Sequence, residues 1–278
     1  MTDPAIRADL AELLRRHRAT LKHRFGQNFL VDPVLRDLIA DAAGATQDDD
    51  VLEVGAGVGT LTIALATRAR RVVAVELDRT MIPALREVVA ASPTVEVVQA
   101  DVLKFDMNAA FPHGGEIVAG NIPYNLTGAL LPKLLDHAPR PRRIALVVQR
   151  EVAERWTADT GASMSTVAVQ VFTVPRVVMT IPAESFEPSP KVDSALVVME
   201  VRPSPAVDVR DISAFLRFVE AAFQFRRKQL GGTLGRLTGI GGTEAAVRLR
   251  DAGVDPERRP QTLSLPEWEQ VFNRFTAG

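Results

Sequence analysis

A four-residue turn, Asn121–Tyr124, carries the side chains in this sequence that are best suited to chemistry. The turn follows an apolar run, and Tyr124 is the only tyrosine in the chain. At the end of a strand it surrounds a small volume with the Asn121 amide, the carbonyls of Ile122 and Pro123, and one aromatic face. A flat ring that bears an amine fits this volume, because the oxygens accept the amine protons while the tyrosine stacks on the ring. For the motif alone, an ordinary strand-to-helix loop stiffened by proline stays open as the alternative.

A glycine-rich turn with an acid before it predicts a cofactor site. Gly55, Gly57 and Gly59 follow an apolar run, and glycines there allow a tight turn and close approach of a ligand. The dinucleotide fingerprint needs its third glycine at position 60, where this chain has Thr60. The observed spacing resembles the methyltransferase form of the turn, whose cofactor is S-adenosylmethionine. The carboxylate of Glu53 suits the ammonium of that cofactor's methionine end.

Two further acids follow the next two apolar runs. Glu76 is placed to accept hydrogen bonds from the ribose hydroxyls, and Asp101 from the adenine amine. Each acid alone fits a helix N-cap equally well. Together, three acids at the ends of three successive strands lie on the rim where open α/β sheets bind ligands, so we expect S-adenosylmethionine there.

Apolar, β-branched runs alternate with helical stretches, which predicts a doubly wound, Rossmann-like α/β sheet of the class I methyltransferase type. The expected strands are Val51–Val54, Val72–Val75, Val95–Val98, Ile117–Ala119 and Ile144–Val148, and the expected helices are Thr60–Ala69, Thr80–Ala91 and Leu126–His137. Two later runs, Val167–Val178 and Ser194–Val201, have no long helix between them and are expected to form an antiparallel pair at the end of the sheet.

The composition changes at Arg202–Pro205, which reads as a domain boundary. Beyond it the pattern is helical, and Ser264–Glu267 has the spacing of a capping box that opens a final helix. We therefore predict a methyltransferase domain over residues 1–203 and a small all-helical domain over residues 204–278 that binds RNA.

Composition excludes several classes of site. The 278 residues include no cysteine, and the four histidines lack metal-ligand spacing, so we predict neither disulfides nor a metal site. No apolar run approaches the ~18–20 residues of a membrane helix, and the start of the chain lacks a signal pattern. We expect a cytoplasmic protein without membrane contact.

Basic residues gather in clusters although the net charge is −1. Leu13–Val31 holds five Arg or Lys and no acid, and Ala221–Thr243 holds four, which include Arg226, Arg227 and Lys228. Arg140, Arg142 and Arg143 form a third cluster. Clusters of this kind are typical of phosphate binding, so these residues are the candidate RNA contacts; solvated helix faces are the alternative.

The chain resembles the ribosomal RNA adenine N6,N6-dimethyltransferases over nearly its whole length, and within them the bacterial small-subunit (16S) branch. The matching motifs are Phe25–Leu30, Glu53–Gly59, Glu76–Asp78, Asn121–Tyr124, Gln149–Ala153, Phe186–Ser194 and Phe223–Lys228.

This resemblance implies a cofactor site and a target-adenine pocket. With the acids and glycines above, the predicted cofactor residues are Gln27, Asn28, Leu30, Glu53, Gly55, Gly57, Glu76, Leu77, Asp101, Val102 and Asn121. The predicted catalytic pocket comprises Asn121, Ile122, Pro123, Tyr124 and Phe186. Without the resemblance Phe186 reads as a core residue; in a proline-stiffened loop it is expected to provide a second stacking surface.

The implied reaction is dimethylation of adenosine N6 in a loop of 16S rRNA, within the precursor of the small ribosomal subunit, by a monomer that uses S-adenosylmethionine. Two alternatives stay open. One is a large-subunit (23S) adenine methyltransferase of the macrolide-resistance type, since Ile122 is common there whereas the small-subunit branch usually has leucine. The other is a ribosome assembly factor or nucleic-acid-binding protein that keeps the fold without catalysis.

Overall fold

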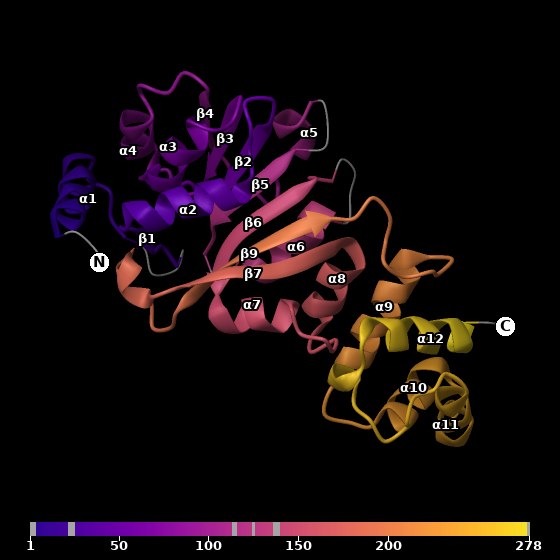
Figure 1. The fold of residues 1–278 in the computed structure, drawn as a ribbon. Helices are drawn as coiled ribbons and strands as arrows, with labels where there is room; N and C mark the ends of the chain where they lie inside the picture. The colour runs from indigo at the N-terminus through magenta and orange to yellow at the C-terminus, as the bar shows by residue number, and fades with distance from the viewer. Residues whose placement is uncertain (1–3, 22–25, 113–115, 124–125, 136–139, 277–278) are drawn as a thin grey trace. The chain divides into compact units, whose positions relative to one another are not determined.

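The computed structural model describes residues 4–21, 26–112, 116–123, 126–135 and 140–276. Tyr124, the aromatic residue of the Asn121–Tyr124 turn, lies outside these residues, as do Lys22 and Arg24 of the first basic cluster. The chain forms two compact units (Figure 1), one of residues 1–153 and 176–201, the other of residues 154–175 and 202–278. Each unit is described by itself.

A seven-stranded sheet, in the order β4-β3-β2-β5-β6-β9-β7, is the centre of the first unit. Its strands are β2 (Asp50–Val54), β3 (Arg71–Glu76), β4 (Val95–Gln99), β5 (Ile117–Asn121), β6 (Arg143–Gln149), β7 (Thr173–Ile181) and β9 (Ser194–Val201). The first five are parallel, and β9 runs antiparallel to β6. The order reverses between β2 and β5, which is where open α/β sheets bind ligands, and the predicted doubly wound fold is confirmed.

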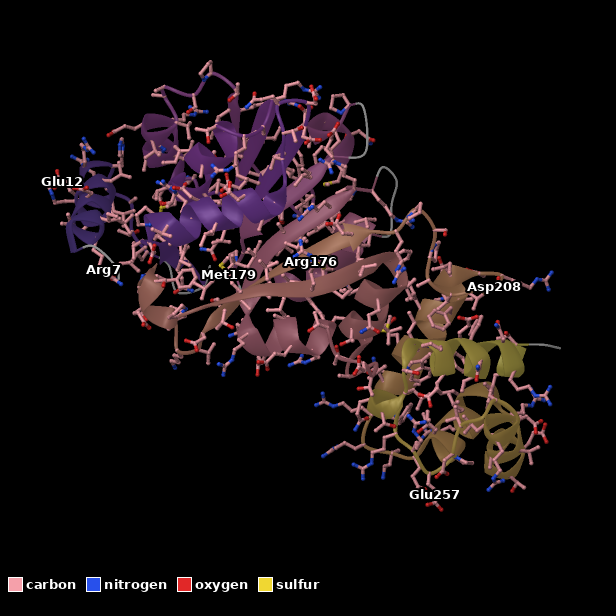
Figure 2. All side chains as sticks on the ribbon, viewed as in Figure 1. Arg7, Glu12, Arg176, Met179, Asp208 and Glu257 are labelled. Carbon is pink, nitrogen blue, oxygen red and sulfur yellow. The ribbon has the colours of Figure 1, made fainter. Side chains whose placement is uncertain are left out.

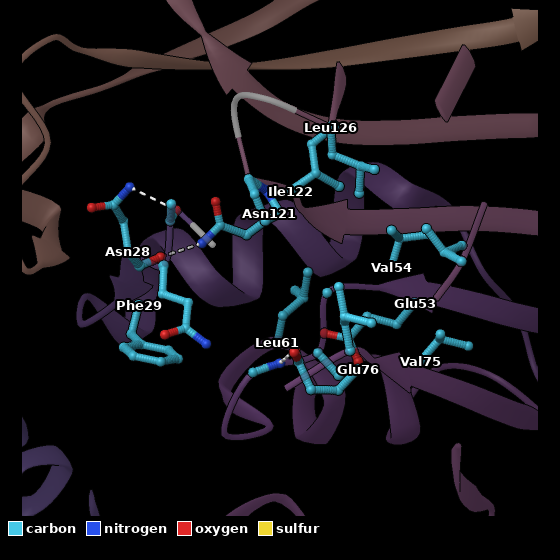
Figure 3. Close-up of a pocket in the computed structure, with 18 of the residues that line it drawn as sticks. Asn28, Phe29, Glu53, Val54, Leu61, Val75, Glu76, Asn121, Ile122 and Leu126 are labelled. Carbon is cyan, nitrogen blue, oxygen red and sulfur yellow. Dashed lines mark hydrogen bonds between the residues drawn. The ribbon is translucent and has the colours of Figure 1, made fainter. Parts of the chain in front are cut away.

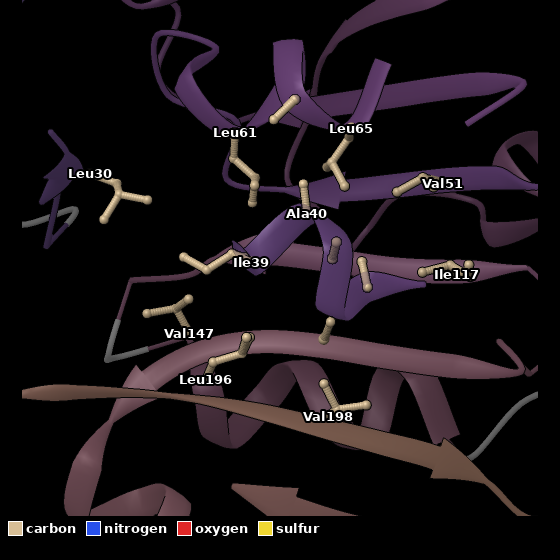
Figure 4. Packing of buried hydrophobic residues seen from close by; sticks show 14 of the residues in the cluster. Leu30, Ile39, Ala40, Val51, Leu61, Leu65, Ile117, Val147, Leu196 and Val198 are labelled. Atoms are coloured by element: carbon tan, nitrogen blue, oxygen red, sulfur yellow. The ribbon is translucent and has the colours of Figure 1, made fainter. Parts of the chain in front are cut away.

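Helices between the strands bury the sheet. They are α2 (Pro33–Ala43), α3 (Thr60–Ala66), α4 (Ile82–Val88), α5 (Met107–Ala110), α6 (Thr127–Leu135) and α7 (Arg150–Trp156). Figure 4 shows Ile39 and Ala40 of α2 and Leu61 and Leu65 of α3 packed with Val51 and other strand residues. Central strands buried on both faces need apolar residues at successive positions, which is why β2 and β3 read as continuous runs rather than alternating ones.

The N-terminal segment closes one side of the sheet's ligand-binding edge. Helix α1 (Pro4–Arg16) contributes Leu10 to a cluster with Phe29, Val58 and Met81. Strand β1 (Phe29–Leu30) pairs antiparallel with β8 (Phe186–Glu187), just after the short helix η2 (Ala183–Ser185). Arg7, labelled in Figure 2, donates hydrogen bonds from α1 to the Glu187 carboxylate and the Glu184 carbonyl. These contacts hold α1 against the segment around β8, and the Phe29 ring of β1 lies next to Gly57 of the glycine turn.

The second unit is helical. It contains α8 (Met164–Phe172), α9 (Ile212–Phe223), α10 (Leu230–Thr238), α11 (Gly242–Asp251), η3 (Pro260–Thr262) and α12 (Leu265–Thr276). Aromatic rings of α9 and α12 pack edge to face, with Phe215 and Phe272 centroids 5.5 Å apart. The capping box is confirmed: Ser264 N–H donates to the Glu267 carboxylate at 2.7 Å, and Glu267 N–H to Ser264 Oγ at 3.4 Å.

One prediction about the segment before β7 was wrong. The first half of the expected strand Val167–Val178 is helix α8, which Ser163 caps by accepting from Thr166 N–H at 3.2 Å. Strand character begins only at Thr173, although β7 and β9 are neighbours as expected. A short apolar run does not distinguish a buried helix from a buried strand, and here the cap decided.

The predicted single boundary at residue 203 also differs from the structure. Residues 154–175 belong with the C-terminal residues, because Phe172 and Val171 accept hydrogen bonds from Arg202 N–H and Ala206 N–H at 2.7 and 2.8 Å. Among the helices of the described ranges, none is long and apolar enough to cross a membrane.

Candidate active site

A cavity of about 300 Å³ opens at the carboxyl ends of β2, β3 and β5, with the segment before β1 as one wall (Figure 3). This volume is at the lower end of the range for small-molecule sites. The structure brings all eleven predicted cofactor residues together around it, and Ile122 and Pro123 join them. The predicted residues that line the cavity are Gln27, Asn28, Leu30, Glu53, Gly55, Gly57, Glu76, Leu77, Asp101, Val102, Asn121, Ile122 and Pro123.

The glycine turn forms the floor next to β2. Gly55, Gly57 and Gly59 all have positive φ, at 72°, 59° and 93°, where a side chain is strained. A Cβ on Gly57 would also lie 2.8 Å from the Phe29 ring. The Gly55 and Ala56 N–H groups donate to the Val75 carbonyl at 2.9 and 3.2 Å, which fixes the turn against β3. The glycines therefore permit the backbone conformation of the turn, and Gly57 also permits the Phe29 ring to pack closely against it.

Glu76, at the end of β3, is a buried carboxylate held by backbone donors. Gly57 N–H donates to one oxygen at 2.8 Å and Asp78 N–H to the other at 2.7 Å, the first of them dashed in Figure 3. Burial raises its pKa, and these two N–H groups act in the opposite direction. The carboxylate is thereby fixed at the middle of the pocket.

Glu53, at the carboxyl end of β2, is the more deeply buried acid. Its exposed fraction is 1%, and its Oε2 has no hydrogen-bond partner among the described residues. Burial raises the pKa of Glu53 to about 8, and the charge of Glu76 adds to the effect. Glu53 lines the cavity, and a buried oxygen without a hydrogen bond is costly, so a polar ligand group beside this carboxyl group would offset that cost.

Asp101 and Leu77 lie on the outer part of the site. Asp101 follows β4 and uses one carboxylate oxygen to accept from Leu103 N–H at 3.0 Å, so its second oxygen has capacity for a ligand. Leu77 is 50% exposed beside the cavity, and Val102 is buried. An apolar side chain next to an acceptor is suited to a flat heterocycle with an amine.

Asn121 links the segment before β1, which lines the cavity, to the Asn121–Tyr124 turn. Its Nδ2 donates to the Asn28 carbonyl at 2.7 Å, between residues 93 positions apart. This bond fixes the amide so that Oδ1 is turned away from Asn28, as Figure 3 shows. Within the described ranges, no group donates a hydrogen bond to Asn121 Oδ1. The next two residues, the buried Ile122 and then Pro123, also line the cavity. The contribution predicted for Tyr124 lies outside the described residues.

The prediction for Phe186 was wrong. Its side chain is 1% exposed, packs in the core cluster with Leu30 and Ile181, and does not line the cavity. The expected irregular loop is instead strand β8, in which Phe186 pairs with Leu30 and turns its ring into the core. The core interpretation, which the residue alone supports, is the one the structure bears out.

The third basic cluster does not face the cavity. Arg142 and Arg143 lie at the amino end of β6, the edge of the sheet opposite the site, and pair with Asp49 at 2.8 Å and Glu200 at 3.0 Å. Arg143 also donates to the Ala42 carbonyl at 2.9 Å. Arg140 donates to the Leu135 carbonyl at 2.5 Å. These three arginines hold the fold together, which does not support the predicted RNA contact.

Arg226, Arg227 and Lys228 are placed differently. All three are exposed in the turn after α9, and no carboxylate within the described ranges pairs with them. Arg236 lies 5.6 Å from the centre of the Phe225 ring in the same segment. Unneutralised cations of this kind are available to phosphates.

Several apolar residues that line the cavity are not among the predicted site residues, including Phe29, Leu61, Leu126 and Ala129. Phe29 lies between the predicted residues Asn28 and Leu30, and Leu61 is in the first turn of the helix after the glycine turn, so their closeness to these motifs is a usable signal. Leu126 and Ala129 precede and begin α6, and no local pattern marks which face of that helix meets the cavity.

Comparisons with known proteins agree with this geometry. The family model described as ribosomal RNA adenine dimethylase matches residues 18–277. "Ribosomal RNA small subunit methyltransferase A" of Pelotomaculum thermopropionicum is 41% identical, over 99% of this chain and 97% of that protein. The protein of the same name in Geobacillus thermodenitrificans is 38% identical, over 94% and 93%.

Two solved structures share the fold. The 23S rRNA methyltransferase ErmE has a TM-score of 0.72 at 31% identity, over 89% of this chain and 99% of that one. A dimethyladenosine transferase from Plasmodium falciparum has a TM-score of 0.74 at 24% identity, over 88% and 96%. The matches extend through the helical C-terminal residues as well as the sheet. The chain therefore belongs to the ribosomal RNA adenine dimethylase family.

Proposed function

We propose that this protein transfers methyl groups from S-adenosylmethionine to the N6 amines of adenosines in small-subunit (16S) ribosomal RNA, and that it dimethylates them. The observation that carries the proposal is the Asn121 amide, fixed by Asn28 with its oxygen left as an acceptor at the edge of an acid-lined cavity. The identity of 41% and 38% to small-subunit methyltransferases, each over more than nine-tenths of both chains, supports the choice of RNA.

The charges of the cavity fit this cofactor. Three carboxylates, Glu53, Glu76 and Asp101, line it, and no Lys, Arg or His does so within the described part of the chain. Such a site disfavours a pyrophosphate and favours a ligand with positive groups. When bound, S-adenosylmethionine supplies a sulfonium-activated methyl group. Asp101 would hold the adenine amine, Glu76 the ribose hydroxyls, and Glu53 the ammonium of the amino-acid end.

The target amine needs orientation more than a base, because its lone pair is delocalised into the ring. Asn121 Oδ1 and the Ile122 or Pro123 carbonyl would accept hydrogen bonds from its two N–H groups, which favours a pyramidal nitrogen and stabilises the charge that develops on it. After each transfer the methylated nitrogen loses one proton to solvent. Tyr124 would stack on the extruded base. The exposed cations Arg226, Arg227 and Lys228 would bind phosphates of the RNA, giving affinity with little sequence choice.

The likeness to ErmE favours one second candidate, methylation of 23S rRNA, because that enzyme is 31% identical over almost all of its own length. Ile122 is in keeping with it. Mapping of the methylated nucleotides after reaction with each purified subunit decides between the two. Methylation confined to the large subunit would exclude the small-subunit proposal.

The decisive experiment compares the wild type with Asn121→Ala in transfer of labelled methyl groups to immature small ribosomal subunits. We expect cofactor binding to remain, since the other cofactor residues are unchanged, and the transfer rate to fall by roughly 10²–10³-fold, as for the loss of one fixed polar group at a reacting centre. An unchanged transfer rate in Asn121→Ala would show that Asn121 does not take part in the reaction. Naked RNA oligomers serve as the comparison substrate, and we expect slower methylation of them.

A further inference from the structure

Two buried carboxyl groups of the cavity have different surroundings. Glu76 receives two backbone N–H bonds, from Gly57 and Asp78, whereas Glu53 Oε2 receives none from the described residues and the Thr62 hydroxyl is the donor near that carboxyl group. Both side chains are nearly inaccessible to water, at 8% and 1% exposure. Hydrogen bonds to a carboxylate stabilise its charged form, and burial without them favours the neutral acid. The two acids are therefore set up for different protonation states.

The elements around Glu53 offer it no countercharge. Strands β3 and β5 pair Ala74 and Ala119 beside it, and α3 places only Thr62 near its carboxyl group. The charged groups beyond these are acids: Glu76 and Asp78 after β3, and Asp101 after β4. Burial raises the pKa of Glu53 to about 8, the charge of Glu76 adds to the effect, and the Thr62 hydroxyl acts in the opposite direction.

The order of the acids along the sheet indicates which part of a ligand meets Glu53. Asp101 follows β4, Glu76 ends β3 and Glu53 lies near the end of β2, and these strands are consecutive neighbours in the sheet. Asn121 ends β5, on the other side of β2. In the proposed function Asp101 holds the adenine and Glu76 the ribose. The amino-acid end, with its ammonium, then lies nearest Glu53.

We propose that Glu53 carries a proton when the cavity is empty and releases it when the ammonium of the ligand's amino-acid end binds. The inference rests on the proposed function, which supplies the ligand. The Glu53 carboxyl loses its O–H proton to solvent, the ligand keeps its ammonium proton, and the new carboxylate and the ammonium form an ion pair. Recognition of the amino-acid end is thereby coupled to pH, and the empty cavity avoids holding a third uncompensated negative charge.

The test is isothermal titration calorimetry of the full chain in buffers with different ionisation enthalpies, which counts the protons released. At pH 6.0 and 7.0 the α-amino group of the ligand, with a pKa of about 7.7–8.0, is still protonated. We expect nearly one proton to be released with S-adenosylmethionine and with S-adenosylhomocysteine, since both have the ammonium. Methylthioadenosine, which lacks the amino-acid end, should release none.

Glu53→Gln is the key variant, because glutamine has the shape of the neutral acid without its proton. Its proton release should vanish, and its affinity for S-adenosylmethionine should be flat between pH 6.0 and 7.0, where the wild-type affinity rises up to about tenfold. Asp101→Asn also removes one lining carboxylate and is the matched control: its affinity should fall at every pH, because it loses the proposed contact to the adenine, but the protons released per ligand bound should stay as in the wild type. Thermal unfolding of both variants verifies that they fold.

The outcomes separate the inference from the function beneath it. If the folded wild type binds none of the three ligands, the proposed function fails. If it binds them with no proton released, or with the same release in Glu53→Gln, the assignment to Glu53 is overturned. Release by S-adenosylmethionine alone would overturn the ammonium as the partner, because S-adenosylhomocysteine differs from it by the sulfonium.

Discussion

At the scale of single residues, this site depends on polar groups whose partners are fixed before any ligand arrives. The Asn121 amide is oriented by the Asn28 carbonyl, and the Glu76 carboxylate by the N–H groups of Gly57 and Asp78. Groups held in this way need little reorganisation during reaction, which is the main source of electrostatic catalysis. Glu53 is the exception, since its Oε2 lacks a partner among the described residues.

The raised pKa of Glu53 predicts a pH-dependent stability. Its pKa is about 8 in the folded chain against an ordinary value of 4.5, so the folded state binds more protons between these values. The associated stability is complete below about pH 4.5 and is lost as pH rises towards 8, by at most about 1.4 kcal/mol per pH unit. Urea unfolding between pH 5.5 and 8 measures this slope.

Glu53→Gln removes the titrating proton, so the difference in unfolding free energy between variant and wild type should shift in favour of the variant as pH rises. Other groups titrate in both proteins and cancel in that difference. A constant difference across the range would show that Glu53 is ionised throughout.

At the scale of elements, caps and pairings decide where each segment ends. Strand β8 turns Phe186 inward by pairing with β1, and Ser163 starts α8 within a run that reads as strand. In α12, Glu267 bonds Ser264 and also Arg258, which holds the pKa of Glu267 below its usual range. That helix presents Trp268 and Phe272 to the aromatic cluster of the second unit.

Ser264→Ala should lower the unfolding free energy of the chain by about 1 kcal/mol, because the first-turn N–H of Glu267 loses its acceptor. Chemical denaturation followed by tryptophan fluorescence suits the measurement, since Trp268 is in α12. Ser264→Asp, which keeps a capping oxygen, is the control and should retain most of the stability. An equal loss in both variants would contradict the capping explanation.

At the scale of the whole molecule, the distribution of charge matters more than its sum. The net charge is −1, yet Arg226, Arg227 and Lys228 stand exposed without described acidic partners, whereas Arg142 and Arg143 are paired. The same residue types thus have different roles. Only unpaired cations release counterions when phosphates bind, so only they should contribute a salt-dependent affinity.

Replacing Arg226, Arg227 and Lys228 together by Gln should weaken binding to ribosomal RNA and reduce the slope of log affinity against log salt by roughly 2–3. Filter binding at several salt concentrations measures both quantities. Arg142→Gln with Arg143→Gln is the matched control and should lower stability while leaving the slope unchanged. A comparable loss of slope in the control would show that Arg142 and Arg143 also contact phosphates of the RNA.

The sequence by itself determined the doubly wound sheet, the family and the cofactor rim. Each depends on local spacing: apolar runs that become strands, and glycines and acids placed directly after Val54, Val75 and Ala100. In a parallel sheet the carboxyl ends of neighbouring strands share one edge, so residues that follow strands must converge. That is why the predicted cofactor residues at the ends of β2, β3, β4 and β5 line one cavity.

Only the tertiary structure decided which faces of distant segments meet. The Asn28–Asn121 bond spans 93 positions, Arg143 finds Glu200 across the antiparallel pair of β6 and β9, and residues 154–175 join the C-terminal unit. A sequence pattern specifies that a side chain is apolar or charged. Whether Phe186 faces a ligand or the core, and whether an arginine meets a carboxylate or solvent, is set by the packing of elements far apart in the chain.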